Sequence, residues 1–590
     1  MQDSNAPQAP RTDATGPQPM NAPGEPGASL ESPAEAVASA PASPWGARWF
    51  IPIAALLIAA AAIAVVWGQL EIMRQNKVLT TFVLGSLSLI ACGVWALLLA
   101  GFTVQLRQRL IASLVLMAGL AVALLRVDGF SGDLVPIIRL RLASRPAPSP
   151  TPTPAAPTSN DPAKTTAPAQ PATPRLSDAP MPGLADYPQF HGPNRDAVAP
   201  GLALATDWVA KPPRKLWRRP IEEAWSAFAV RGRRAVTQEQ RGDRECVSCY
   251  DVATGEPLWL HCDTTRHETG FGGVGPRATP TLTLDRAFTL GANGRLNCLD
   301  LATGKLIWTH DILSENASTN IEWGMAGSPL LLDDRVIVSA GGKPNQSLVA
   351  YQQSDGKKAW AAGDSTQAYS SPALLSLAGH PQIVILNAND VTGHDPATGT
   401  PLWSTPWPGK YPKVTTPIPL PSLTGDPPHS ARIFVTSSYG VGSAAYLLTR
   451  ETPTPESFTW TVQQTWKSQR IGLKFSNAVL HEGHVYGLDD GRLTCADAAT
   501  GKLISKGRST GDYGHGQCIL LPALADRPAL LLITAESGDV ALVKLDPAQP
   551  VELTRFSALE GKTWNNPALA GRYLLVRNHR EAACYELPLP

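Results

Sequence analysis

The sequence has no excess of charge of either sign: 50 basic and 49 acidic residues leave a net charge of +1 over 590 residues. Proteins that bind nucleic acids through their phosphates carry a basic patch or a clear positive balance. The composition therefore gives no electrostatic basis for nucleic-acid binding, and we expect no nucleic-acid partner.

The chain also lacks the motifs of several common catalytic sites. No Gly-x-Ser-x-Gly elbow occurs, and the carboxylates show no evident pairing. The run Gly270–Gly275 has the spacing of a dinucleotide loop, but Pro276 follows it where such a loop needs a helix. His481-Glu-Gly-His484 is one residue short of a zinc-protease helix and lies between two strand patterns, so it predicts a turn. We assign no catalytic residue and no metal ligand.

Cysteine is present, but not in a metal-binding pattern. Four of the eight cysteines occupy one position of a sequence repeat, where other copies have Ala or Gly, as expected for a small buried residue. Cys246 and Cys249 have C-x-x-C spacing, yet residues three apart on a strand face opposite sides, which argues against a shared metal. Reflecting the strands about the turn 253–255 places Cys246 opposite Cys262. This pair predicts a disulfide in an oxidising compartment, with two unpaired thiols as the alternative.

A phrase of about ten residues recurs after residue 245. Its clearest copies are Tyr250–Trp259, Leu299–Trp308, Tyr351–Trp360 and His394–Trp403. Each copy predicts strand, tight turn and strand, because Gly supplies the positive φ that the turn needs. Repeats spaced by about 40 to 50 residues are typical of four-stranded propeller blades. Weaker copies end at Trp460, Ser505 and Phe556, and Trp217 ends the first, partial copy. These eight copies predict an all-β, eight-bladed propeller.

The repeat tryptophans are expected to be structural, as large apolar plates that fill the gaps between neighbouring sheets. They are Trp217, Trp259, Trp308, Trp360, Trp403 and Trp460. After Phe556 the chain offers only three strands, so the last blade lacks its outer one. We predict that Lys215–Ile221 supplies this strand and closes the ring, which leaves no free sheet edge.

The segments before the propeller differ from it in composition. Four divisions are predicted: a disordered tail at 1–45, a membrane domain at 46–128, a Pro/Ala/Thr-rich linker at 129–185, and the propeller at 186–590. Apolar runs at about 49–67, 80–102 and 110–125 predict three transmembrane helices. The first run starts late and has no small-residue cleavage site, so it is not read as a removable signal.

Three spans place the two ends of the chain on opposite sides of the membrane. With a cytoplasmic amino terminus, the propeller lies on the periplasmic side of the inner membrane. The distribution of basic residues supports this orientation only slightly. The cytoplasmic side would carry Arg48, Arg107 and Arg109, and the periplasmic side Arg74 and Lys77.

The phrase Ala-x-Asp-x-x-Thr-Gly-x-x-x-Trp resembles the repeat of pyrroloquinoline-quinone (PQQ)-type propellers over residues 187–590. The opening Tyr187–Asp196 is similar to that of the BamB-like, PQQ-binding-like repeat proteins of bacteria. Quinoprotein alcohol and glucose dehydrogenases share the repeat, and the resemblance to them implies PQQ with Ca²⁺ over the propeller axis and a carboxylate base. No Asp or Glu of this chain can be matched to that base, and no adjacent Cys-Cys pair or haem Cys-x-x-Cys-His occurs.

The BamB lipoproteins are binding scaffolds without a cofactor, anchored by a lipidated cysteine that three spans replace here. We therefore expect a membrane-tethered binding or scaffold module with a protein partner and no cofactor. The alternative is a PQQ- and Ca²⁺-dependent oxidoreductase acting on an alcohol or sugar.

A ligand site in a propeller is expected at the axis, where the inner strands converge. Aromatic and cationic side chains beside the starts of these strands could stack on a planar anion and neutralise it. This candidate axial ring consists of Trp225, Arg277, Trp323, Tyr369, Lys474, His515 and Trp564.

Overall fold

The structure is a computed structural model that describes residues 50–69, 72–141, 176, 180–409, 412–454, 457–507 and 510–590. The predicted disordered tail, residues 1–45, lies outside the described residues, as does most of the predicted linker.

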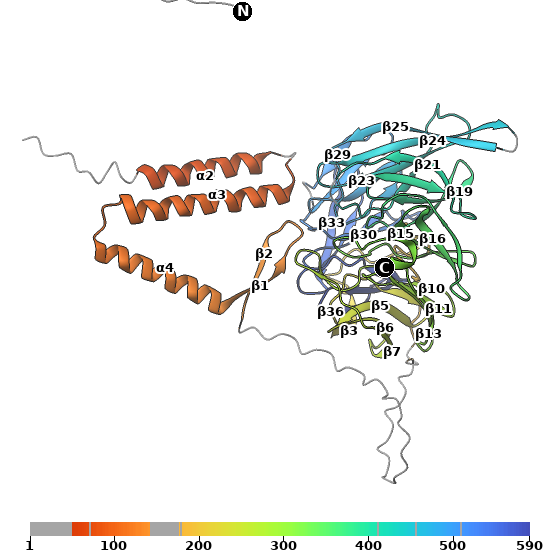
Figure 1. Cartoon of the computed structure of the whole chain (residues 1–590), viewed down its shortest axis with the longest axis horizontal. Helices are drawn as coiled ribbons and strands as arrows, with labels where there is room; N and C mark the ends of the chain where they lie inside the picture. The colour runs from red at the N-terminus through yellow and green to blue at the C-terminus, as the bar shows by residue number, and fades with distance from the viewer. Residues whose placement is uncertain are drawn as a thin grey trace, which may run out of the picture.

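Three helices precede the propeller and extend from one side of it (Figure 1). They are α2 (Phe50–Gly68), α3 (Arg74–Val94), which continues as the π-helical turn η1 (Trp95–Leu99), and α4 (Val104–Leu124). All three are long and apolar enough to cross a membrane. The second begins six residues before the predicted run, because its first turn carries Arg74 and Lys77, which hydropathy assigns to a loop.

Eight four-stranded antiparallel sheets form the propeller, which confirms the predicted fold. Blades one to four are β4 (Ala229–Arg231), β5 (Arg234–Arg241), β6 (Arg244–Asp251), β7 (Pro257–Asp263); β10 (Thr281–Leu282), β11 (Arg286–Leu290), β12 (Arg295–Asp300), β13 (Leu306–Asp311); β14 (Leu330–Leu332), β15 (Arg335–Gly342), β16 (Gln346–Gln352), β17 (Lys358–Ala362); and β18 (Ala373–Leu377), β19 (His380–Leu386), β20 (Asp390–His394), β21 (Pro401–Pro406). Blades five to seven are β22 (Ile418–Leu420), β23 (Ser430–Ser437), β24 (Gly442–Thr454), β25 (Ser457–Ser468); β26 (Val479–His481), β27 (His484–Asp489), β28 (Arg492–Asp497), β29 (Leu503–Lys506); and β30 (Gln517–Leu521), β31 (Leu530–Thr534), β32 (Asp539–Lys544), β33 (Val551–Ser557).

Blade eight closes the ring as predicted. Its inner strands are β34 (Ala568–Ala570), β35 (Tyr573–Arg577) and β36 (Glu581–Glu586), and its outer strand is β3 (Arg214–Pro220) from the start of the domain. Trp217 of β3 lies opposite Cys584 of β36. The first and last segments of the propeller are therefore held in one sheet, so the ring has no open seam.

The repeat phrase joins several blades to the next through a similar contact. The Trp217 indole nitrogen donates to the Val252 carbonyl at 2.8 Å, and the ring covers Gly255, the turn glycine of blade one. Trp259 and Trp308 bond in the same way to Leu301 and Gln353 of the following blades. The small buried cysteines at the repeat position lie opposite these rings, as in the pair Cys249 and Trp259.

In blade five this contact is made by Trp466 and not by Trp460. The Trp466 indole donates to the Ala498 carbonyl at 3.1 Å and covers Gly501, whereas Trp460 packs beside Phe458 and His380. The reason is that β24 and β25 are extended beyond the length of the other blades, which moves the repeat position along β25. Trp403 departs too, since its indole donates to Gln382 Oε1 within its own blade at 2.6 Å.

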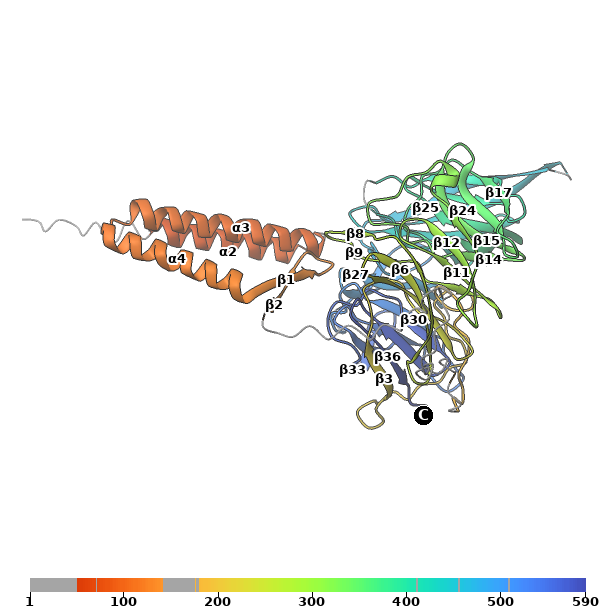
Figure 2. The same cartoon turned by 60° about the horizontal axis from the view of Figure 1, so that its bottom comes forward.

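A β-hairpin follows the third helix where the sequence predicted the start of a linker. Strands β1 (Leu125–Phe130) and β2 (Pro136–Leu140) pair antiparallel, with Val127 opposite Ile138. Figure 2 shows this hairpin between the helices and the propeller, near the short hairpin of β8 (Glu268–Thr269) and β9 (Gly273–Val274). A 3₁₀ turn, η2 (Ser314–Asn316), follows blade two.

The helical segment contacts one face of the propeller, formed by the turns between the second and third strands of the blades. The backbone N–H of Arg74 donates to Asp490 in the β27–β28 turn at 3.0 Å, and its guanidinium pairs with Asp512 in the loop after β29. We call this the helix-side face, and the opposite face, which carries the repeat turns, the distal face.

Candidate functional site

Two members of the predicted axial ring, Trp225 and Trp564, pack against each other with ring centroids 4.9 Å apart and planes tilted by 33°. The Lys562 ammonium lies 4.3 Å from the centroid of Trp564 and 4.9 Å from that of Trp225, so it makes cation–π contacts with both. Burial lowers the pKa of Lys562 to about 8. Blades one and eight therefore contribute a compact cationic and aromatic group to the helix-side face.

Arg277, Trp323 and Tyr369 lie on the next blades of the ring. Arg277 donates to the carbonyls of Gly272 at 2.9 Å, Gly273 at 3.1 Å, and Gly275. The same Gly272 carbonyl accepts from the Trp225 indole at 2.7 Å, so the glycine run that resembled a nucleotide loop fastens Arg277 to Trp225. Trp323 and Tyr369 contact each other with centroids 5.5 Å apart. The guanidinium of Arg277 is thus committed to the protein backbone.

Lys474 and His515 complete the ring, and both contact the tip of the β1–β2 hairpin. The Lys474 ammonium donates to the Gly132 carbonyl, and the His515 Nε2 lies 3.1 Å from Asp133 Oδ1. Both ring side chains are buried. Ring members from several blades therefore converge at the axis, but the chain itself occupies the centre.

The sequence reasoning missed Phe475, Lys562, Glu536 and Asp133 as parts of this site. Phe475 lies between Trp564 and His515, at centroid distances of 5.0 and 5.2 Å. Glu536 accepts from the Trp564 indole at 3.0 Å. Phe475 and Lys562 are sequence neighbours of residues that were selected, so extending each choice by two residues could have found them. Asp133 carried no comparable signal, because it lay in the predicted linker.

The distal end of the axis is filled by the segment that opens the propeller. Tyr187 forms an antiparallel bridge with Val230, and Val198 a parallel one with Leu520. Between them, the buried His191 lies 3.1 Å from Asn566 Oδ1, and burial lowers the pKa of its imidazole to about 3. Arg195 donates to the carbonyls of Ser328 and Pro329 at 3.1 and 2.9 Å. Both ends of the propeller axis are therefore closed by segments of this chain.

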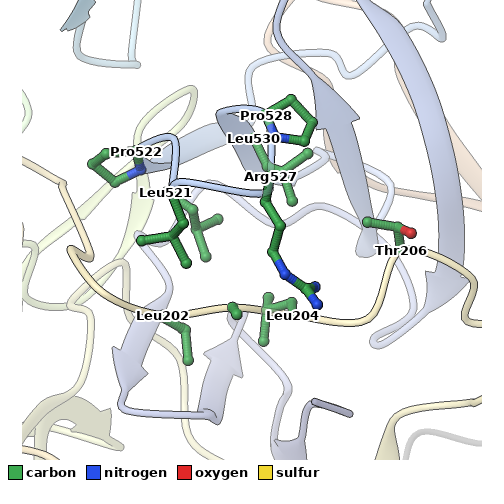
Figure 3. A pocket seen from close by; sticks show the side chains of 10 residues that line it. Leu202, Leu204, Thr206, Leu521, Pro522, Arg527, Pro528 and Leu530 are labelled. Carbon is green, nitrogen blue, oxygen red and sulfur yellow. The ribbon is translucent and has the colours of Figure 1, made fainter. Parts of the chain in front are cut away.

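Two hollows of the propeller lie away from the axis. One, of about 40 Å³, lies between Leu202, Leu204 and the β30–β31 connection, with Arg527 reaching across it (Figure 3). It is large enough for water but not for a cofactor. A wider one of about 460 Å³ lies on the distal face between Gln189, Thr281, Leu284 and Gln353. Leu284 at its edge is 83% exposed.

The ring as arranged does not fit PQQ with Ca²⁺. Among the described residues, no three His, Cys, Asp or Glu side chains are grouped to hold a metal ion. The donors that would meet a planar anion, Arg277 and Lys474, are bonded to backbone carbonyls, and the stacking faces of Trp225 and Trp564 meet each other and Lys562. We derive no catalytic step from these residues.

The structure joins Cys246 to Cys262 in a disulfide across β6 and β7. The cysteines at the repeat position remain free thiols within the blades. Burial raises the pKa of the Cys495 thiol to about 11, which makes it a poor nucleophile at neutral pH.

Residues 243–507 match the family model described as outer membrane protein assembly factor BamB. A europium-containing methanol dehydrogenase is similar in structure, at 13% identity and TM-score 0.50, covering 68% of this chain and 98% of that one. The quinohemoprotein alcohol dehydrogenase from Comamonas testosteroni is similar at 14% identity and TM-score 0.50, covering 69% and 82%. BamB from Moraxella catarrhalis has 15% identity and TM-score 0.40, covering 64% and 98%. No curated protein sequence matches the chain.

At such identities the likeness to the dehydrogenases shows the fold alone. The chain is therefore a β-propeller of eight four-stranded blades, preceded by three helices apolar enough to cross a membrane, and residues 243–507 of it match the BamB family model.

Proposed function

We propose that this protein is a membrane-anchored scaffold whose propeller binds a protein partner on its distal face. The observation that carries the proposal is the closure of the axis at both ends by the chain's own segments, around Asp133 on one side and Arg195 on the other. A cofactor enzyme needs that space for its ligand. A scaffold can use its outer surfaces instead.

The distal face offers a surface suited to a protein. The hollow of about 460 Å³ has polar walls, including Gln189 and Gln353, and the apolar Leu284 stands exposed at its edge. A protein interface combines an apolar centre with a hydrogen-bonding rim, and we propose that Leu284 and its polar neighbours supply part of each. The helices leave this face free, since their contacts lie on the helix-side face.

The proposed location is the inner membrane, with the propeller in the periplasm. Three apolar helices in sequence support this orientation for a cytoplasmic amino terminus. The disulfide of blade one supports it too, because structural disulfides persist in oxidising compartments.

The partner is tested by a photo-crosslinking amino acid placed at position 284 in cells. We expect one protein adduct from this position and none from the same amino acid at Val551, which is also apolar and 42% exposed but lies on β33, outside the hollow. Identical adduct patterns from both positions would contradict a partner at the distal hollow.

The oxidoreductase alternative is tested separately by thermal unfolding of the full chain in detergent with and without PQQ and Ca²⁺. A ligand that binds only the folded state raises the melting temperature. We expect no change, whereas a saturable rise would reject the scaffold proposal in favour of the alternative.

A further inference from the structure

The tip of the β1–β2 hairpin, residues 131–134, is recognised by the propeller as a ligand would be. Asp133 is only 4% exposed, and its carboxylate meets the His515 Nε2 at 3.1 Å and the Arg74 Nε at 3.3 Å. Burial alone would raise the pKa of Asp133, but the His515 hydrogen bond and the charges of Lys474 and Arg74 outweigh it and lower this pKa. The carboxylate is therefore held in its ionised form.

The backbone of the tip is recognised on both sides as well. The Gly132 N–H donates to Glu536 Oε1 at 2.8 Å, and its carbonyl accepts from Lys474. Glu536 is fixed in turn by the Trp564 indole and by the His515 N–H, at 3.0 and 2.9 Å. Two blades therefore bind the backbone of Gly132: Glu536 accepts from its N–H, and Lys474 donates to its carbonyl.

The site also selects for glycine before the aspartate. A Cβ atom added at Gly132 would lie 1.8 Å from the His515 Cδ2, a separation at which the imidazole or the hairpin must move. The ring side chain that bonds the carboxylate therefore excludes any larger residue at the preceding position. Together these contacts define a site for a Gly-Asp turn.

Lys474 indicates that the site requires an anion. It is 4% exposed, and burial lowers the pKa of its ammonium group, while nearby carboxylates, Asp133 first among them, oppose that shift. A buried ammonium without a compensating charge is unfavourable by several kcal/mol. Removal of the tip would take away the largest of these opposing charges and leave those of Asp490 and Glu536, so the ammonium favours another carboxylate in the place of Asp133.

Outside its tip, the hairpin exposes apolar side chains and contacts the propeller through Phe130. Its exposed side chains include Val127, Ile138 and Leu140, and a two-stranded hairpin alone is marginally stable in water. Phe130 adds a ring contact to Phe271 of the propeller, at 5.8 Å. Lys562 also donates to the Phe130 carbonyl at 3.1 Å, so the contacts of Phe130 hold the seated position together with those of Gly132 and Asp133.

We propose that the helix-side mouth of the propeller axis is a binding site for a Gly-Asp turn, and that the hairpin tip is its tethered occupant. The hairpin then acts as a latch between the helices and the propeller. When the latch is released, the site accepts the same chemistry, a carboxylate on a glycine-preceded turn, from another chain.

The latch is tested by hydrogen exchange on the full chain in phosphatidylcholine nanodiscs. We expect Gly132→Ala to speed exchange in residues 130–136 by roughly tenfold or more, because the tip can no longer seat. The control is Gly119→Ala in α4, where an added Cβ meets nothing within 4 Å, and it should leave that exchange unchanged. Asp133→Asn provides a second variant with the same expected direction. Unchanged exchange in both tip variants would overturn the proposal.

The binding chemistry is tested with a peptide of residues 129–136, Gly-Phe-Ser-Gly-Asp-Leu-Val-Pro. We expect it to bind the Gly132→Ala, Asp133→Asn double variant with a Kd on the order of 100 μM, and the occupied wild-type protein at least tenfold more weakly. Peptides with Asn for the Asp, or Ala for the second Gly, should not bind. Failure of the first peptide to bind a double variant whose hairpin exchanges rapidly would overturn the site.

Discussion

Gly255 of the first repeat turn meets two separate requirements, a positive φ and close packing, whereas Gly483 in the β26–β27 turn, outside the repeat phrase, meets only the first. Gly255 and Gly483 have nearly equal φ values of +72° and +75°. A Cβ at 255 would lie 2.6 Å from the Trp217 ring, whereas one at 483 would meet nothing within 4 Å. We expect Gly483→Ala to cost about 1 kcal/mol from backbone strain, and Gly255→Ala about 2–4 kcal/mol because the indole must also move. Urea unfolding followed by tryptophan fluorescence measures both, and equal losses would show that the Trp217 contact is not tight.

Glu245 makes stability depend on pH. Burial raises the pKa of this carboxyl to about 7, against the opposing effects of the Ala292 N–H and the Arg277 charge. Between the unfolded value of 4.5 and this one, the folded state binds more protons, so stability falls as pH rises. At about 1.4 kcal/mol per pKa unit, the loss is about 3 kcal/mol at most by pH 8.

Substitution of Glu245 by Gln removes the titration while keeping an acceptor for the Ala292 N–H, which lies 3.1 Å from both carboxylate oxygens. We expect urea midpoints of Glu245→Gln to change less between pH 5 and pH 8 than those of the wild type. If the urea midpoints of the wild type and of Glu245→Gln changed equally with pH, the pH dependence would not come from Glu245.

At the residue scale, the sequence indicated candidate ring positions but not their contacts. Trp225 and Trp564 were selected because they lie beside the predicted starts of inner strands, where the blades converge. The partners of Arg277 could not be predicted, because they are backbone carbonyls of an irregular loop. Such contacts depend on the path of the loop and not on residue type.

At the element scale, the hairpin β6–β7 carries the only disulfide among the described residues. It closes a loop with a sequence separation of 16. Loop-closure entropy for such a length predicts a contribution of about 3 kcal/mol at most, less where the strands already hold the ends together. We expect a reducing agent to lower the melting temperature of the wild type but not of the Cys246→Ala, Cys262→Ala double variant. An equal response of both proteins would place the reductant's effect elsewhere.

Elements with a repeat or a long apolar run were predictable, and the hairpin β1–β2 was not. Its strands are short, and Leu125 continues the apolar composition of α4, so periodicity assigns it to the helix. Residues 129–140 precede a Pro-rich stretch, so they were assigned to the predicted linker and not to strands. The extra length of the hairpin β24–β25 was not predicted for a related reason. Because the spacing between repeats changes there, the sequence pattern selected Trp460 as the repeat tryptophan, whereas Trp466 makes the contact.

At the scale of the whole molecule, Arg577 fastens blade eight to blade one. Its guanidinium donates to Thr237 Oγ1, the Gln238 carbonyl and the Glu222 carbonyl, each at 2.8 or 2.9 Å, and the side chain is fully buried. Lysine cannot serve three acceptors in this forked arrangement. We expect Arg577→Lys to destabilise the propeller by about 2–4 kcal/mol, measured by urea unfolding of the full chain.

The control for ring closure is Arg527→Lys. Arg527 is partly exposed and pairs with the adjacent Asp526, so this change should shift the urea midpoint by less than about 0.5 kcal/mol. If both variants unfold alike, the joint between blades eight and one does not limit stability.

The sequence by itself determined the eight blades, the closing strand and the three apolar helices, because each is written as a local period or run that repeats along the chain. Tertiary structure alone decided what fills the axis. Gly132 and Glu536, and likewise Arg195 and Ser328, are far apart in sequence and meet only when the ring has closed. Contacts of this kind depend on where separate segments end in space, which no local pattern encodes.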